Sequence, residues 1–379
     1  MSLQPSYRPL VEPLEHRELL AAGLQAYVSG GNLYVSGTGG SDSIRVSQSS
    51  TQIAVAGITI ATNNGPANSV NSADIVKLII YGNGGNDTIN LGTVKIDALV
   101  YAGNGHDTII LGTGHDAVVN GGGFDWTYRP YSPTTPIVDG LAVSDIHQGQ
   151  DPLCQTDAAL AEDVQQGYNF GNNIQYLGNN WYQVKLFGNL ASQKVYYNGW
   201  TNSEDLVSSN KSEFWTVLMQ RARLQALGID PYKQYTMSQW DAFNRQTNGR
   251  LYSIGEAMYD FTGSVAIYSS FNGATPQALQ AALDRGNYLV AQSQTGRYVS
   301  GDGIIGNHAY AVLGVYNDGG VWKVRLYNPW GIDRENGATI DGLDKSRPAA
   351  NDGFITLTWQ QFTNSNNFKG YFEAKSVGK

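Results

Sequence analysis

Three side chains of the chain, those of Cys154, His308 and Asn328, could serve as a nucleophile, a base and an amide that orients the base. A thiol becomes a strong nucleophile when a nearby base removes its proton, and imidazole titrates in the range that suits this task. An amide oxygen that binds one ring nitrogen of a histidine leaves the other nitrogen to face the thiol. Because Cys154 is the single cysteine, the sequence excludes an intrachain disulfide and a multi-cysteine metal site.

A β-hairpin is predicted to bring the histidine and the asparagine together. Asn317-Asp318-Gly319-Gly320 is a strong turn signal between two apolar runs, residues 308–316 and 321–328. Antiparallel pairing about this turn gives partner numbers that sum to about 637, which puts His308 opposite position 328 or 329. The sequence therefore predicts a pair formed by His308 and Asn328.

Cys154 is predicted to lie at the start of a helix that covers residues 154–167. The positive end of the helix dipole lowers the pKa of a thiol at this position. Gln148, six residues earlier, is long enough to donate an amide N–H to an oxyanion that forms beside the thiol. His147 is the rival base, but its position next to Gln148 would place it on the oxyanion side. Two further helices are predicted over residues 212–227 and 276–285.

Four separate motifs, in this order along residues 136–374, resemble the catalytic core of the calpain family, which is papain-like. They are Gln148 with Cys154, the segments Glu213-Phe214-Trp215 and Glu256-Ala257-Met258-Tyr259-Asp260-Phe261-Thr262-Gly263, and His308 with Asn328-Pro329-Trp330-Gly331. The resemblance implies a two-lobed α+β cysteine endopeptidase. Its implied roles are nucleophile for Cys154, general base and acid for His308, orienting amide for Asn328, oxyanion donor for Gln148 and cleft residue for Trp330. The chain departs from the family pattern beside the thiol, where Leu153 precedes and Gln155 follows.

The same resemblance implies a calcium site in the first lobe. Its ligands would be the carbonyls of Val138 and Gly140 and the carboxylates of Asp145 and Glu256, since oxygen ligands suit calcium. The alternative is that Asp145 only caps a turn and Glu256 only caps a helix. In the second lobe an arginine stands where the family has an acid, and Asp333, Glu335 or Asp341 could substitute for that acid.

Residues 30–123 hold 18 of the 45 glycines, interleaved with short β-branched runs that predict many short strands. A nine-residue pattern, G-G-x-G-x-D-x-U-x with some replacements, recurs there and places aspartates at positions 42, 87, 107, 116 and 125. Each repeat can form half a turn of a parallel β-roll that binds cations between its turns. The pattern resembles the RTX calcium-binding repeats, with Asp87, Asp107, Asp116 and Asp125 as the implied ligands. The alternative is a glycine-rich β-sandwich or linker whose aspartates only cap turns.

The sequence thus predicts a multidomain chain with an all-β, β-roll-like repeat region before an α+β, papain-like two-lobed protease core. The predicted parts are a leader of an export type (residues 1–28), the repeat region (29–128), a linker (129–136), the lobe with the cysteine (137–264) and the lobe with the histidine and asparagine (265–379). The leader resembles a short motif of exported bacterial proteins, which favours an extracellular or cell-surface location. No apolar run approaches the roughly 18 residues of a membrane span.

A net charge of −8 argues against nucleic acid as a partner and leaves carboxylates for cations. The predicted function is calcium-dependent hydrolysis of peptide bonds in protein substrates. The alternative from another class is a calcium-binding surface or adhesion protein with an inactive protease-like domain. A transglutaminase-type acyltransferase fits less well, because the third residue here is an asparagine before Pro-Trp.

Overall fold

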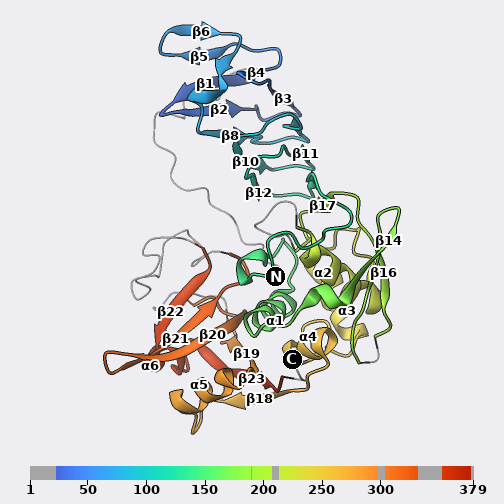
Figure 1. Ribbon diagram of the computed structural model, residues 1–379, viewed down its shortest axis with the longest axis vertical. Coiled ribbons are helices and arrows are strands. Elements are labelled where there is room, and N and C mark those ends of the chain that lie inside the picture. The colour runs from blue at the N-terminus through green and yellow to red at the C-terminus, as the bar shows by residue number, and fades with distance from the viewer. Residues whose placement is uncertain (1–22, 189, 207–212, 297–303, 332–351, 377–379) are drawn as a thin grey trace. The chain divides into compact units, whose positions relative to one another are not determined.

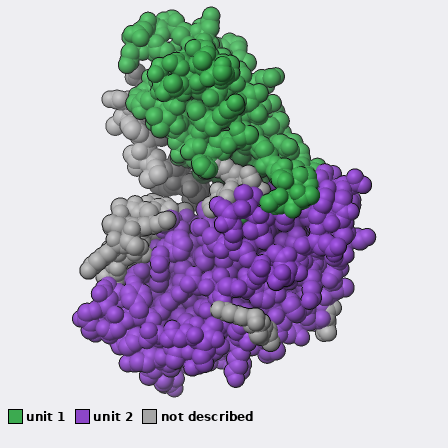
Figure 2. Space-filling view, viewed as in Figure 1, with its two compact units in different colours: residues 1–135, 198–204, 210–213 green, residues 136–197, 205–209, 214–379 purple. Residues whose placement is uncertain are grey.

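The computed structural model describes residues 23–188, 190–206, 213–296, 304–331 and 352–376. The chain forms two compact units (Figures 1 and 2), of which one holds residues 1–135, 198–204 and 210–213 and the other holds 136–197, 205–209 and 214–379. The first unit is rich in strands, and the second is a mixed α/β core. The predicted domain boundaries and the division of the core into two lobes stay predictions. Residues 1–22 of the predicted leader lie outside the described residues.

Two sheets build the strand-rich unit (Figure 1). One sheet has the spatial order β12 (Ala117–Asn120), β10 (Asp97–Gly103), β8 (Lys77–Tyr81), β2 (Asn32–Ser36), β1 (Gln25–Ser29), β5 (Ile60–Thr62) and β6 (Gly65–Ala67). The other has the order β17 (Trp200–Asn202), β13 (Trp126–Tyr128), β11 (Thr108–Ile110), β9 (Thr88–Asn90), β3 (Ser43–Gln48), β4 (Gln52–Val55) and β7 (Val70–Asn71). A short 3₁₀ helix, η2 (Ser72–Asp74), follows β7.

From β8 to β13 the chain alternates between the two sheets, with one strand in each, and neighbours within a sheet are parallel. Thr108 pairs with Thr88 on one side and with Trp126 on the other, so one complete circuit takes 20 or 18 residues. Burial alternates along β8, β9, β10 and β11, as in β8, where Leu78 and Ile80 are fully buried. The apolar residues of both sheets therefore form one shared core.

Glycine is required where one circuit lies on the next. Gly123 has a φ of 135°, and a Cβ atom added to it would lie 1.5 Å from the carbonyl oxygen of Gly105. A Cβ atom on Gly105 would in turn lie 1.7 Å from the carbonyl oxygen of Gly85. The glycines of the repeats thus allow successive turns to approach more closely than any side chain permits.

The second unit combines six helices with two antiparallel sheets among its described residues. The helices are α1 (Cys154–Gln165), α2 (Trp215–Ala226), α3 (Met237–Gln246), α4 (Ile254–Thr262), α5 (Pro276–Asp284) and α6 (Trp359–Phe362), with 3₁₀ helices η3 (Val143–Asp145) and η4 (Phe170–Asn173). The small sheet has the order β14 (Ile174–Gly178), β15 (Trp181–Val184) and β16 (Gln193–Tyr196). The large sheet has the order β18 (Ala266–Ser270), β23 (Phe368–Ala374), β19 (Tyr288–Ser293), β20 (Ala309–Asp318), β21 (Val321–Tyr327) and β22 (Phe354–Thr358).

The predicted helices are present, with one late start. The helix predicted over 276–285 forms as α5, with Thr275 as its N-cap and Pro276 in its first turn. The helix predicted over 212–227 begins only at Trp215, because Phe214 takes the N-cap position and Glu213 is buried before it. Within the described part of the chain, no helix is both long enough and apolar enough to cross a membrane.

Candidate active site

Helix α1 begins at Cys154, as the sequence predicts, and packs against β19 and β20 of the large sheet. Its N-cap is Leu153, which offers no side-chain hydrogen bond to the first turn. The backbone N–H of Ala309, the first residue of β20, faces the sulfur of Cys154. The structure thus brings the thiol to the residue that directly follows His308.

The predicted hairpin is confirmed, with a turn centred one residue later than the sequence predicts. Strands β20 and β21 pair around Gly319-Gly320, whose φ angles are 59° and 91°. Partner numbers sum to 639 next to the turn, where Asp318 pairs with Val321, instead of the predicted 637. An irregularity between Val312 and Gly314 lowers this sum to 638, so Ala311 pairs with Tyr327 instead of the neighbouring Leu326.

His308 and Asn328 nevertheless meet through a buried hydrogen bond of 2.7 Å between Nε2 and Oδ1. The backbone N–H of Trp330 donates to the same Asn328 oxygen at 3.1 Å, which shows that this atom accepts. Nε2 of His308 must therefore carry the hydrogen, and Nδ1 remains as the basic nitrogen. The ring centroid of Trp330 lies 4.6 Å from that of the His308 imidazole.

Gln148 lies in the loop that precedes α1, and its side-chain amide donates to the carbonyl of Asp151 at 2.7 Å. Its backbone N–H donates to the carbonyl of Pro329 at 2.8 Å, which ties this loop to the segment after Asn328. The ring of the rival base, His147, packs against Gly331, where an added Cβ atom would lie 2.9 Å from the ring.

Burial controls the protonation of the site. It raises the pKa of the Cys154 thiol from 9.0 to about 12, while the Ala309 N–H lowers that pKa and the carboxylates of Asp157 and Asp151 raise it. Burial lowers the pKa of His308 from 6.5 to about 4, against the opposing effect of the hydrogen bond to Asn328. The thiol shift is opposite to the one predicted from the helix N-terminus, since loss of water outweighs the dipole. Both groups are therefore neutral near pH 7.

The sequence of residues 124–347, more than half of the chain, matches the family described as "Calpain family cysteine protease". The chain belongs to the calpain family. Residues 1–123, which include most of the repeat region, lie outside the matched region.

Two named calpains are similar to part of this domain. Calpain clp-4 of Caenorhabditis elegans is 27% identical over 152 residues, which cover 36% of this chain and 19% of that protein. Calpain-12 of Homo sapiens is 28% identical over 144 residues, which cover 36% of this chain and 18% of that protein. The chain thus matches less than a fifth of the length of either calpain.

The four residues predicted as calcium ligands of the calpain domain have different surroundings. Asp145 is buried at the end of η3, and its Oδ2 accepts the N–H of Ala142 at 2.8 Å. The carboxylate of Glu256, in the first turn of α4, forms an ion pair of 3.3 Å with Arg250. Val138 is 49% exposed.

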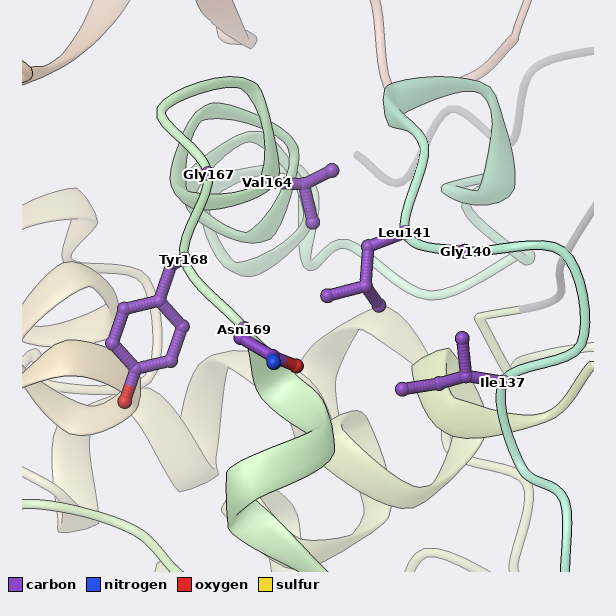
Figure 3. A pocket seen from close by; sticks show the side chains of 7 residues that line it. All are labelled: Ile137, Gly140, Leu141, Val164, Gly167, Tyr168 and Asn169. Carbon is purple, nitrogen blue, oxygen red and sulfur yellow. The ribbon is translucent and has the colours of Figure 1, made fainter. Parts of the chain in front are cut away.

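Gly140, the fourth predicted ligand, borders a pocket of about 310 Å³ at the C-terminal end of α1 (Figure 3). The side chains of Ile137, Leu141 and Val164 give this pocket an apolar wall. No group of three or more His, Cys, Asp and Glu side chains in the described ranges is placed to hold a metal ion. Calcium in the calpain domain stays a prediction.

Three of the predicted aspartate ligands in the repeats are joined in a ladder, each just before a strand of the second sheet. The Asp42 N–H donates to Asp87 Oδ1 at 2.8 Å, the Asp87 N–H to Asp107 Oδ1 at 2.8 Å, and the Asp107 N–H to Asp125 Oδ1 at 3.0 Å. The Asp125 N–H donates to the hydroxyl of Ser203 at 3.3 Å. Asp116 instead precedes β12 of the first sheet, and its Oδ1 accepts the N–H of Ala98 at 3.0 Å.

The second carboxylate oxygen distinguishes these residues. Oδ2 is buried and has no hydrogen-bond partner among the described residues in Asp87, Asp107, Asp116 and Asp125. Burial raises the pKa of Asp87 and Asp116 to about 6 and that of Asp125 to about 7. Asp42 differs, because its Oδ2 accepts the N–H of Thr38 at 2.6 Å and the Thr38 hydroxyl at 2.9 Å. Buried, unpartnered carboxylate oxygens next to glycine turns fit a hard cation.

Sequence reasoning missed several buried polar residues around α1. Asp151 and Gln220, 4% and 1% exposed, are hydrogen-bonded to each other beside the loop that holds Gln148. Asp157, Glu162 and Asp163 on α1 are completely buried, and burial raises their pKa values well above the ordinary range. The sequence signal for Gln220 was its position in the predicted helix at 212–227, whose apolar face identifies buried positions.

Proposed function

We propose that the chain is a cysteine endopeptidase in which Cys154 is the nucleophile, His308 the general base and acid, Asn328 the orienting amide and Gln148 an oxyanion donor. The observation that carries the proposal is the buried hydrogen bond between His308 Nε2 and Asn328 Oδ1, beside the helix that begins at Cys154. This bond leaves Nδ1 as the nitrogen that can take the thiol proton. Similarity to calpains supports the same roles.

The proposed reaction is acyl transfer from a peptide to the thiol and then to water. His308 Nδ1 removes the thiol proton while the sulfur attacks the peptide carbonyl, and the amide of Gln148 with the N–H of Cys154 stabilises the oxyanion. The imidazolium then protonates the leaving amine, which departs and leaves a thioester. His308 next takes a proton from water, and the resulting attack releases the acid and restores the thiol.

The protonation state favours general-base catalysis in this scheme. A thiol pKa of about 12 and a histidine pKa of about 4 make a preformed thiolate–imidazolium pair the minor form. Proton transfer must then accompany attack, and neutral His308 is available for it near pH 7. The carboxylate of Asp151 adds negative charge near the sulfur and favours the neutral thiol further.

We also propose that the repeat region is an RTX-type β-roll that binds calcium through Asp87, Asp107, Asp116 and Asp125. Their buried Oδ2 atoms support this, since a bound cation would neutralise carboxylates that otherwise remain buried and unpartnered. Calcium would supply positive charge, and the carboxylate oxygens of these aspartates would coordinate it. The ladder of Asp87, Asp107 and Asp125 offers neighbouring carboxylates for this purpose.

A calcium-stabilised repeat region fits an environment rich in calcium, so we propose that the protein acts outside the cell or at its surface. In the calpain domain the fit to calcium is poorer, because Arg250 already pairs with the predicted ligand Glu256. The residues proposed as second-lobe ligands, Asp333, Glu335 and Asp341, lie outside the described residues.

The test is cleavage of an unfolded protein substrate at neutral pH under reducing conditions, with calcium titrated and with Cys154→Ala as the matched control. Cleavage that rises with calcium and disappears in Cys154→Ala is the expected result. Cleavage that is independent of calcium would keep the catalytic residues and reject the dependence on calcium. Absence of cleavage at every calcium level would favour the alternative, a calcium-binding adhesion protein with an inactive calpain-like domain. Transfer of the acyl group to an added primary amine in place of water would instead indicate an acyltransferase.

A further inference from the structure

Two groups of Asp151, its backbone carbonyl and its carboxylate, accept hydrogen bonds within the loop from Gln148 to Leu153. The carbonyl of Asp151 accepts the side-chain amide of Gln148 at 2.7 Å, and Oδ1 of its carboxylate accepts the N–H of Leu153 at 3.3 Å. Leu153 is the N-cap of α1, and Cys154 follows it. Asp151 therefore contacts both the oxyanion donor and the start of the helix that carries the thiol.

Asp151 is held from the other side by Gln220, which lies in α2. Nε2 of Gln220 donates to Oδ2 of Asp151 at 2.6 Å, and Oε1 of Gln220 accepts the N–H of Leu206 at 2.7 Å. The carbonyl of Leu206 accepts the hydroxyl of Thr216, one turn earlier in α2, at 3.0 Å. All of these residues are buried, so water does not substitute for the hydrogen bonds.

The hydrogen bonds can run in only one direction. The N–H of Leu206 can only donate, so the Gln220 atom that faces it is the oxygen, and the amide nitrogen faces Asp151. Both carboxylate oxygens of Asp151 then accept, one from Gln220 and one from Leu153. An amide at position 151 would place a donor against the amide nitrogen of Gln220 or against the N–H of Leu153. A carboxylate at position 220 would face the carboxylate of Asp151.

We propose that Asp151 and Gln220 are positioning residues, which hold the loop so that the Gln148 amide and the first turn of α1 keep the geometry that acyl transfer needs. This inference rests on the proposed function. The role is geometric, since the carboxylate of Asp151 disfavours the thiolate that the reaction forms. If Asp151 acted only through its charge, its neutralisation would speed the reaction, whereas loss of positioning slows it.

The experiment is an exchange of the two functional groups in the full chain. Asp151→Asn and Gln220→Glu each break the hydrogen-bond polarity, and we expect kcat to fall about 10- to 100-fold in each, with KM changed less than about 3-fold. The double variant D151N/Q220E restores the three described bonds, because the new amide at 151 accepts from Leu153 and donates to the new carboxylate at 220, which also accepts from Leu206. Its kcat is expected to return to within about 3-fold of the unchanged protein.

Thr216→Val is the matched control, since it removes a buried hydrogen bond of α2 to Leu206 and leaves Asp151 and Gln220 in place. It is expected to lower the unfolding temperature and to keep kcat. Unchanged kcat in both single variants, or an equal loss in Thr216→Val, would overturn the proposal. A folded double variant that does not recover would overturn it as well. If a single variant fails to fold, the proposal still requires that the double variant folds and cleaves the substrate.

A second measurement separates this inference from the proposed function. Hydrogen exchange of the peptide that covers residues 148–154 reports the order of the loop whether or not the protein cleaves anything. Protection is expected to fall in both single variants and to return in the double variant. If the protein shows this pattern of protection but cleaves nothing, the proposed endopeptidase activity is rejected and the positioning role of Asp151 and Gln220 is supported. If it cleaves and loop protection is unchanged in all variants, only the positioning role is rejected.

Discussion

Replacement of Asp125 by asparagine is expected to stabilise the calcium-free repeat region near neutral pH. Burial raises the pKa of Asp125 from 3.8 to about 7. A carboxyl whose pKa is raised in the folded state favours folding below its unfolded pKa, and this contribution is lost as the pH rises through the folded pKa. The loss therefore falls between about pH 4 and pH 7.

The pKa shift sets the size of the effect. At about 1.4 kcal/mol per pKa unit, the ionised carboxyl destabilises the folded state by at most roughly 4 kcal/mol, and about half of that remains if solvent screens the turn. The asparagine of Asp125→Asn keeps an oxygen for the N–H of Asp107 and carries no charge. The free energy of unfolding should then rise by about 2 kcal/mol near pH 7.5 and change little near pH 4.

Hydrogen exchange of strands β9, β11 and β13 in the full chain measures this locally. The expected 2 kcal/mol corresponds to exchange slowed about 30-fold near pH 7.5 without calcium, at the same pH as the unchanged protein. Calcium should protect the unchanged protein and have less effect on the variant. Asp42→Asn is the matched control, because Thr38 already donates twice to Oδ2 of Asp42, and it should give no stabilisation. Equal effects of Asp125→Asn near pH 4 and pH 7.5 would refute the reasoning.

Three further outcomes are expected. In Asn328→Ala the imidazole of His308 loses the acceptor of its Nε2 hydrogen, so kcat should fall about 10- to 100-fold in a cleavage assay. A fall of less than about 2-fold would contradict the role assigned to Asn328. The rate of Cys154 alkylation by iodoacetamide should rise steadily from about pH 6 to pH 9, because burial raises the pKa of the thiol, and a rate that is already high and constant near pH 6 would show a thiolate instead. Gly123→Ala should lower the unfolding temperature of the repeat region, since its Cβ atom would meet the Gly105 carbonyl. Gly39→Ala is the control, because open space surrounds that position, and it should leave the unfolding temperature unchanged. Equal effects of the two substitutions would disprove the close stacking of turns.

Residues typical of turns and helix caps made the local structure of some segments predictable from the sequence. The double glycine at 319–320 marked the hairpin, and Thr275 with Pro276 marked α5. The register still differed, because the turn is centred on the two glycines and not on the whole segment 317–320, and because the irregularity at Val312 and Gly314 leaves no signal in the sequence pattern. Placement of His308 against Asn328 survived this shift, since the side chains reach over more than one register position.

Properties that depend on distant parts of the chain could not be predicted in this way. The sequence predicted that a helix starts at Cys154. The burial that raises the pKa of the Cys154 thiol, however, comes from elements that pack around the helix in three dimensions. The nine-residue spacing indicated stacked turns, yet Asp42 and Asp87 are neighbours in the ladder despite a separation of 45 residues. The chain between β3 and β8 forms β4 to β7, and β2 and β3 still pair directly with β8 and β9. Gln220 looked like one polar residue of a helix until its partner Asp151 was known.

The last strand of the second sheet has a consequence for how the protein is made. Strand β17 (Trp200–Asn202) pairs antiparallel with β13 (Trp126–Tyr128), although residues 136–197, which belong to the other unit, lie between them in the chain. A ribosome that has released β13 has therefore not yet made the strand that covers its edge, and this edge stays open to other extended chains until β17 emerges. The two units are also interleaved in the gene, so recombination at a single point cannot transfer the repeats with their last strand. We expect the repeat region and the protease domain to be inherited, and to complete their folding, together.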